Sequence, residues 1–302
     1  MPFVESWKPW SSGPEYLLTF FCTEKYRNMD MNNIRSRHVA LYENNTCRTC
    51  EKTLIGEEPL LIRIEDQPYS VIMRTPGEEI PHAAGFCLGE GIVDEYEDFA
   101  AIGYCGQTAP NAVTVKLQPA RRKKAAALLK RGCFISQTSC GICGKEMMEE
   151  LRQVLTRITD ETVINVDQAI DCTARLNGYQ GLYKKTRAAH AAMLFDAQLN
   201  VLSSAEDVGR HNALDKAIGK LFLSSRLAQA RLAVLSSRIS YELIQKAARA
   251  HLSILISMSR PTSLAVELGQ SLNMTLACLA RPSGLLVFCG EQRLEKSTQS
   301  HA

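Results

Sequence analysis

The sequence predicts a layered α/β protein. Two observations support this class. Residues 188–279 alternate between short apolar runs and helical patterns, and residues 57–90 follow the order strand, turn, strand, helix. Repeated strand–helix–strand units produce parallel strands that are covered by helices.

The bulk composition is that of a soluble globular chain. It has 302 residues, of which 45% are hydrophobic and 22% are charged, and its net charge is +3. This charge does not indicate a nucleic-acid partner, and the apolar run at 16–22 is far too short to span a membrane. The 11 cysteines are an odd number with no secretory signal at the start of the chain. We therefore expect free thiols in a reducing cytoplasm.

The first part of the chain has little periodicity. Residues 1–45 are expected to form a loose or docked extension, because no hydrophobic period persists there. Cys47 and Cys50 form a CxxC pair. This pair either contributes to a zinc site with other ligands or consists of ordinary loop cysteines.

Regular structure is expected from about residue 57. An Asp/Pro turn separates β-branched runs that predict strands, and acids in the first turn with an apolar face predict the first helix. The basic helix is either a solvated surface or a docking surface for an acidic partner or ligand. In this half we expect strands at 59–64, 69–73, 111–117, 133–135 and 162–164, and helices at 78–90, 121–130, 145–158 and 167–177.

The last third carries the clearest alternation. Its strands are apolar throughout, and its helices have apolar residues at helical spacing. We expect strands at 188–195, 200–203, 232–235, 253–256 and 275–279, and helices at 211–222, 241–250 and 263–270.

Three strand ends in this region carry small or basic polar residues. Ser236-Ser237-Arg238 and Ser257-Met258-Ser259-Arg260 each precede a helix, and Ala280-Arg281-Pro282-Ser283-Gly284 follows the last strand. Ligands of open α/β sheets bind at the carboxyl ends of strands, where helix N-termini and arginines favour phosphate. The pattern predicts an anionic, nucleotide-like ligand, although glycine-rich dinucleotide and P-loop signatures are absent.

A second polar cluster occupies residues 206–216, with Asp207, Arg210, His211 and Lys216 near a helix start. It is either a helix cap in which Asp207 accompanies an Arg210 ion pair, or a ligand-binding or catalytic loop. His190 lies on an apolar strand, where a buried and satisfied histidine is the simpler interpretation.

Cys140-Gly141-Ile142-Cys143-Gly144 is the motif with the most reactive composition. Flanking glycines leave the thiols unobstructed, and a following helix with Lys145 favours the thiolate. The spacing is compatible with a sulfur carrier or redox dithiol, with a metal half-site, or with a structural pair.

Several long motifs resemble one known family, the formate dehydrogenase accessory sulfurtransferases (FdhD). The resemblance covers about residues 51–290 in order. It is carried by Met73-Arg74-Thr75-Pro76-Gly77, Ser139-Cys140-Gly141-Ile142-Cys143-Gly144-Lys145, His190-Ala191-Ala192, Glu206-Asp207-Val208-Gly209-Arg210-His211-Asn212-Ala213 and Ser263-Leu264-Ala265-Val266.

The resemblance implies a fold and an organisation. It implies a cytidine-deaminase-like layered α/β domain with a smaller α+β N-terminal domain, in a homodimer. The predicted organisation is an extension at 1–50, the smaller domain at 51–145 ending in the CxxC loop, the α/β domain at 146–292 and a tail at 293–302.

The resemblance also implies a function. Sulfur would pass as a persulfide from a cysteine desulfurase to the bis-guanine-dinucleotide molybdenum cofactor, which is a bound substrate, for formate dehydrogenase. Cys140 would form the persulfide, with Cys143 as its partner. Together with the strand ends, the predicted cofactor-binding residues are Leu279, Ala280, Arg281, Pro282, Ser283, Gly284, Ser237, Arg238, Ser259, Arg210 and His211.

Two departures from the family pattern matter. Thr186-Arg187-Ala188-Ala189 replaces a glycine turn before His190, and the deaminase zinc signature is absent because Ser139 precedes Cys140. We therefore predict neither deamination nor a catalytic metal. The alternative function is a non-catalytic cofactor-binding chaperone with redox or zinc-binding cysteines.

Overall fold

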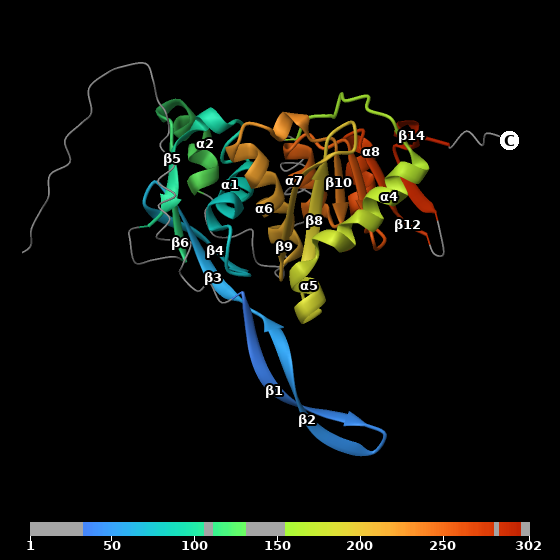
Figure 1. The fold of residues 1–302 in the computed structure, drawn as a ribbon. Coiled ribbons are helices and arrows are strands. Elements are labelled where there is room, and N and C mark those ends of the chain that lie inside the picture. The colour runs from blue at the N-terminus through green and yellow to red at the C-terminus, as the bar shows by residue number, and fades with distance from the viewer. Residues whose placement is uncertain (1–32, 106–110, 131–154, 281–283, 297–302) are drawn as a thin grey trace, which may run out of the picture. The chain divides into compact units, whose positions relative to one another are not determined.

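The computed structural model describes residues 33–105, 111–130, 155–280 and 284–296, all within the unit Asn32–Ala302. These residues form a mixed α/β structure with two main sheets (Figure 1). The α/β class is confirmed. The cytidine-deaminase likeness of its layering stays a prediction. In the described part of the chain, no helix has the length and apolar character needed to cross a membrane.

The smaller sheet has four strands in the order β4-β3-β6-β5. β3 is parallel to β6, and the two outer pairs are antiparallel. Apolar residues of β3 and β6 alternate into the core, which helix α1 covers. The elements are β3 (Glu58–Ile64), β4 (Gln67–Arg74), α1 (Glu79–Gly89), β5 (Phe99–Tyr104), β6 (Ala112–Leu117) and α2 (Pro119–Lys130).

The larger sheet has six strands in the order β13-β12-β11-β10-β8-β9. β10, β11 and β12 are parallel, as the strand–helix alternation predicts, whereas β8 and β13 are antiparallel to their neighbours. The strands are β8 (His190–Phe195), β9 (Val201–Asp207), β10 (Leu232–Leu235), β11 (Ile254–Ser257), β12 (Thr275–Leu279) and β13 (Leu285–Cys289).

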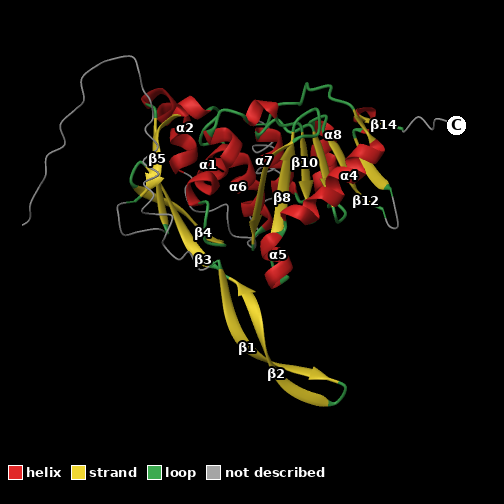
Figure 2. Ribbon diagram, in the orientation of Figure 1, coloured by secondary structure: helices red, strands yellow, loops and turns green. Residues whose placement is uncertain are grey.

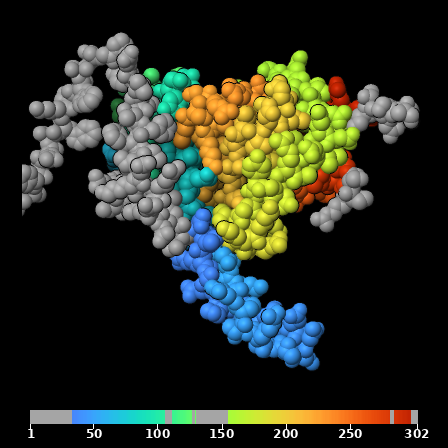
Figure 3. Space-filling view, viewed as in Figure 1, coloured from blue at the N-terminus to red at the C-terminus, as the bar shows by residue number. Residues whose placement is uncertain are grey.

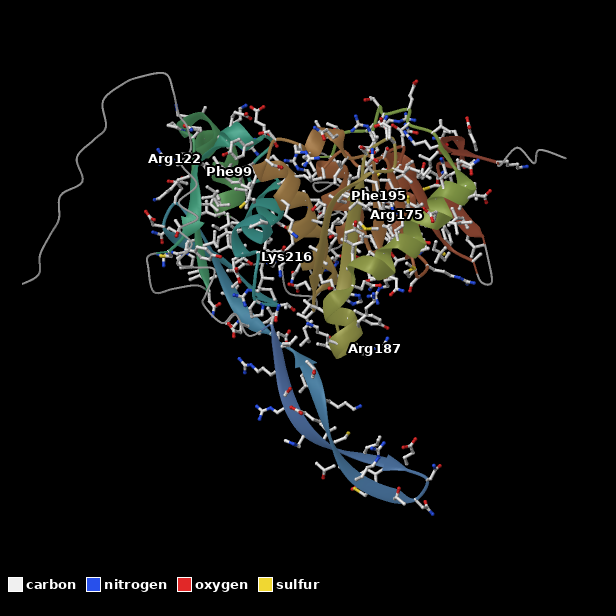
Figure 4. The ribbon with its side chains drawn as sticks, in the orientation of Figure 1. Phe99, Arg122, Arg175, Arg187, Phe195 and Lys216 are labelled. Atoms are coloured by element: carbon white, nitrogen blue, oxygen red, sulfur yellow. The ribbon has the colours of Figure 1, made fainter. Side chains whose placement is uncertain are left out.

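Helices cover both faces of this sheet (Figure 2). One core includes residues of α6 (Arg210–Leu223), α7 (Tyr241–Arg249) and α8 (Ser263–Ser271), and it continues into the smaller sheet through α1. The other face packs against α4 (Val166–Leu176). There Arg175 lies over the Phe195 ring at 5.0 Å from the ring centroid (Figure 4). Helices on both faces bury the central strands completely, which explains why β10 and β11 are continuous apolar runs.

Several short elements were not expected from the sequence. Edge strand β5 and helix α5 (Gly181–Thr186) are short and only partly buried, so they lack a clear hydrophobic period. The predicted strand at 162–164 is reduced to β7 (Ile164–Asn165), which pairs with β14 (Leu294–Glu295). The predicted strand at 133–135 and most of the helix predicted at 145–158 lie outside the described residues. Residues 155–158 carry no helix, so that end of the prediction is wrong.

The N-terminal part contains an unexpected hairpin of β1 (Ile34–Glu43) and β2 (Thr46–Ile55). The boundary expected between residues 50 and 51, which separates the extension from the smaller domain, therefore falls inside β2. The domain limits themselves stay a prediction. Cys47 and Cys50 lie on this strand and not in a loop. Residues three apart on a strand point to opposite faces, so these thiols do not form a single metal half-site.

Candidate functional site

The carboxyl ends of the three parallel strands open onto one edge of the larger sheet. Ser236-Ser237-Arg238 follows β10, and Met258-Ser259-Arg260 follows β11. Ser259 and the two arginines are exposed, whereas Ser237 is buried. After β12, the amide of Ala280 donates to the carbonyl of Gly284 across the turn at 2.9 Å. Arg281, Pro282 and Ser283 of this turn lie outside the described residues, as do Cys140 and Cys143.

Antiparallel strand β8 brings a histidine to the same edge. His190 is its first residue, and the amide of the next residue, Ala191, donates to Ser236 Oγ at 2.8 Å. His190 Nδ1 lies 3.5 Å from the same Ser236 oxygen. His190 is half-buried at the candidate site and is not enclosed in the core. The interpretation of this residue as a fully buried histidine is therefore wrong.

The N-termini of α6 and α7 complete the edge. Arg210 and His211 begin α6, and Ser240 is the N-cap of α7. His211 Nε2 lies 3.0 Å from Ser240 Oγ and 3.7 Å from Glu242 Oε2. Ser240 and Glu242 are not among the candidates that the sequence predicts. The sequence pattern that could have identified them is their position as N-cap and first-turn acid of the predicted helix at 241–250.

Positive charge dominates this edge. Burial lowers the pKa of Arg210, and the nearby Arg238 lowers it further. Burial, followed by Arg210 and Arg238, also lowers the pKa of His190. Arg210 Nε is buried and has no hydrogen-bond partner among the described residues. Glu242 offsets part of the Arg210 charge, whereas no ion pair with Arg238 is found in the described part of the chain. The edge therefore holds neutral imidazoles beside two guanidinium groups and one carboxylate, an arrangement that favours an anion.

His211 reports on this electrostatic environment. Burial first, and then Arg210 and Lys246, lower its pKa from 6.5 to about 4. The unfolded chain takes up this proton near pH 6.5, so stability is lost as pH falls from 6.5 toward 4. We expect the His211 ring to titrate near 4 in an NMR pH series, and His211→Gln to weaken the fall in unfolding free energy over that window.

Binding of inorganic pyrophosphate should also change the pKa of His211. A bound anion would offset the arginine charges and raise the pKa of His211. Arg238→Ala should raise this pKa without pyrophosphate and should reduce the further rise on adding it. An unchanged His211 titration at saturating pyrophosphate would place the anion elsewhere.

Three other polar residues of the 206–216 cluster, Asp207, Asn212 and Lys216, lie together with Thr75 in the buried interior. We call these four residues the junction. Lys216 Nζ lies 2.6 Å from Asp207 Oδ2 and donates to the Thr75 carbonyl at 2.8 Å (Figure 4). The amide of Thr75 donates to Asp207 Oδ2 at 3.0 Å, and Asn212 Nδ2 donates to Asp207 Oδ1 at 2.9 Å. Asp207 thus pairs with Lys216 and not with Arg210, and the N-cap of α6 is Gly209. The predicted cap arrangement is wrong.

This junction connects the two sheets. Thr75 directly follows β4 of the smaller sheet, whereas Asp207 ends β9 of the larger one. A second buried pair joins α7 to α6, with Lys246 Nζ 2.9 Å from Asp215 Oδ2. The 206–216 cluster therefore has two roles, since one set of side chains joins the sheets and Arg210 and His211 face the strand-end edge. In the described part of the chain, no cluster of three or more His, Cys, Asp or Glu could hold a metal ion.

The fold and this edge define an α/β protein of two joined sheets with an arginine-rich strand-end site. The chain belongs to the FdhD/NarQ family, whose model matches residues 55–295. A protein of Streptomyces avermitilis named sulfur carrier protein FdhD is 34% identical over 267 residues, covering 85% of this chain and 94% of the relative. The protein of that name from Mycobacterium tuberculosis is 34% identical over 259 residues, covering 82% and 93%.

A solved structure supports the fold. The crystal structure of a protein from Desulfotalea psychrophila, assigned as a formate dehydrogenase accessory protein, matches with a TM-score of 0.70. It covers 87% of this chain and 99% of its own, at 19% identity. The resemblance that the motifs predicted is thus confirmed at the level of the family.

Proposed function

We propose that this protein is a sulfurtransferase that carries persulfide sulfur from a cysteine desulfurase to the molybdenum cofactor bis(molybdopterin guanine dinucleotide). The loaded cofactor would then serve formate dehydrogenase. The cytoplasm remains the predicted compartment, and a homodimer the predicted assembly. The curated relatives named as sulfur carriers support the carrier role, and the neighbour assigned as a formate dehydrogenase accessory protein supports the destination.

The observation that carries the proposal is the arginine-rich edge beside the β12–β13 turn. The guanine dinucleotide part of the substrate is a phosphate-bearing anion. Arg210 and Arg238 provide two guanidinium groups, of which Arg210 is partly offset by Glu242. Arg210 begins α6 and Ser240 is the N-cap of α7, and helix N-termini favour phosphate. Leu279, the last residue of β12, lies at the same edge, because β12 is parallel to β11. This edge would hold the substrate while Cys140 delivers sulfur.

The chemical role of Cys140 is nucleophilic. Its thiolate would attack the terminal sulfur of the desulfurase persulfide, so that one S–S bond forms on Cys140 as the desulfurase S–S bond breaks. The desulfurase cysteine leaves as a thiolate, and the electrons and atoms balance without a further reagent. Cys143 is the predicted partner of Cys140 in the CxxC motif.

Sulfur loading tests the proposal directly. The protein is incubated with a cysteine desulfurase and free cysteine, and its intact mass is measured without reductant. Wild type is expected to gain one sulfur atom that dithiothreitol removes, and Cys140→Ala is expected to gain none. Cys47→Ala is the matched control because Cys47 is an exposed thiol on the hairpin, and this variant should load like wild type.

Two outcomes would contradict the proposal. Equal loading of Cys140→Ala and wild type would remove Cys140 from the transfer step. No loading of wild type, combined with intact binding of guanosine diphosphate, would favour the cofactor-binding chaperone.

A further inference from the structure

The β1–β2 hairpin is an element that the proposed function does not use. The family model begins at residue 55, so nearly all of the hairpin lies outside the match. Each strand has ten residues, and most residues of both strands are exposed, as Figure 3 shows for one side of the hairpin. A two-stranded sheet of this kind is only marginally stable in water without further packing.

The hairpin contacts the rest of the described structure mainly at its base. The amide of Gly56 donates to the Asn33 carbonyl at 2.7 Å, and Arg35 pairs with Glu58 at 3.4 Å. Helix α5 approaches β2 from the larger sheet. Beyond this base, Tyr42 near the tip is 77% exposed.

The strand register places every Arg and Lys side chain of the hairpin on one face. Side chains alternate between the faces of a strand, so the pairs Arg35–Leu54, Arg37–Lys52, Val39–Cys50, Leu41–Arg48 and Glu43–Thr46 share a face. We call this set the basic face. The opposite face carries the pairs Ser36–Thr53, His38–Glu51, Ala40–Thr49 and Tyr42–Cys47. All four Arg and Lys side chains of the hairpin thus lie on the basic face, among its apolar residues.

The centre of the basic face is electrostatically unfavourable by itself. Arg37 and Lys52 are directly opposite each other in the register, and both are exposed. Like charges at opposite positions destabilise a sheet. Neither has an ion-pair partner among the described residues, whereas Arg35 pairs with Glu58 and Arg48 lies 3.6 Å from Glu43. An anionic partner across this face would remove the repulsion.

We propose that the basic face of the hairpin is a docking surface for an extended acidic segment of a partner protein. The row of two cations, the apolar row Val39–Cys50 and the row Leu41–Arg48 follow one another at about 7 Å, which is the two-residue repeat of a strand. An extended segment in which acidic and apolar side chains take turns at every second residue presents both along one of its faces with the same repeat. The apolar rows distinguish this surface from a purely electrostatic one, and the interaction goes beyond sulfur transfer.

A labelled peptide tests this surface in the full-length protein. The probe is a fluorescein-labelled peptide of Glu-Ser-Val-Ser repeats, in which Glu and Val share one face of the extended chain, and a peptide of Lys-Ser-Val-Ser repeats is its counterpart. Fluorescence anisotropy should show binding of the acidic peptide alone. The double variant Arg37→Glu/Lys52→Glu should weaken it at least about tenfold, because attraction becomes repulsion. Val39→Ser should weaken it by roughly threefold or more, through lost apolar contact.

The control places two glutamates on the other face. Ser36→Glu/Thr53→Glu changes neighbouring positions of the same two strands and should leave binding within about twofold of wild type. Circular dichroism verifies that all variants fold alike.

Three results would overturn the proposal. The first is equal weakening by both double variants, because it would show a general charge effect. The second is binding unaffected by Arg37→Glu/Lys52→Glu. The third is charge-dependent binding of phosphatidylserine vesicles or of a single-stranded RNA in place of the peptide, which would assign the face to a membrane or a nucleic acid.

Discussion

Gly219→Ala is expected to destabilise the protein severely, by at least about 3 kcal/mol, because it overpacks a helix crossing between backbones. A Cβ at Gly219 in α6 would lie 1.8 Å from the carbonyl oxygen of Pro81 in α1. The contact is reciprocal, since a Cβ at Gly85 would lie 2.0 Å from the Asp215 carbonyl oxygen. Backbone atoms cannot rotate away as a side chain can, so the two helices would have to separate.

Two opposing effects decide whether Gly219→Ala lowers or raises the free energy of unfolding. Alanine improves the helix propensity of an interior glycine position by about 1 kcal/mol. Separation of α1 from α6 would disturb a core that continues from one sheet to the other, and we expect this loss to exceed the gain. Urea denaturation measures the difference in unfolding free energy.

Gly178→Ala is the matched control for the helix crossing. A Cβ at Gly178 would meet nothing within 4 Å. The unfolding free energy of the Gly178→Ala protein should therefore differ from that of wild type by less than about 1 kcal/mol. A Gly219→Ala protein with wild-type stability would show that α1 and α6 do not depend on this close approach.

Lys216→Met is expected to cost about 3–5 kcal/mol of stability, because it leaves the buried carboxylate of Asp207 without its counter-charge. The side chains of Lys216 and Asp207 are 2% and 0% exposed. The amide of Thr75 and the amide group of Asn212 would still donate to Asp207, but neither supplies a full positive charge. Thermal and urea unfolding should both show the loss.

Two further variants separate the buried charge from general effects. Lys220→Met removes a lysine one turn along the same helix, where the side chain is 31% exposed and pairs with Glu78, and it should cost about 1 kcal/mol or less. Asp207→Asn/Lys216→Met removes both charges and should recover much of the loss, because no unpaired ion remains. If the double variant is as unstable as Lys216→Met, the buried charge is not the cause.

These two predictions have a functional consequence. The junction and the helix crossing are built from the same part of the chain that presents Arg210 and His211 to the strand-end edge. Asp207 ends β9 three residues before Arg210 begins α6. Loosening the junction should therefore weaken anion binding at the edge as well as stability, although neither Asp207 nor Lys216 faces that edge.

Much of the fold followed from local patterns. The strands β10, β11 and β12 and the helices α6, α7 and α8 lie within one or two residues of their predicted limits. Buried parallel strands are continuous apolar runs, and helices packed on one face have a strong period, so both are visible in a single sequence. The hairpin was missed because exposed strands need no apolar period, and β5 was missed because it is a short edge strand that is only partly buried.

The sequence by itself determined the elements of the larger sheet except β13, the family and the residue types that suit an anion. Only the tertiary structure decided what each polar residue does. Asn212, Lys216 and Gly219 are three or four residues apart, so they share the face of α6 that meets α1 and β4, while Arg210 and His211 occupy its first turn at the sheet edge. That division depends on the rotation of α6 against both sheets. The rotation is set by contacts between residues far apart in the sequence, such as Lys216 and Thr75, which are 141 positions apart.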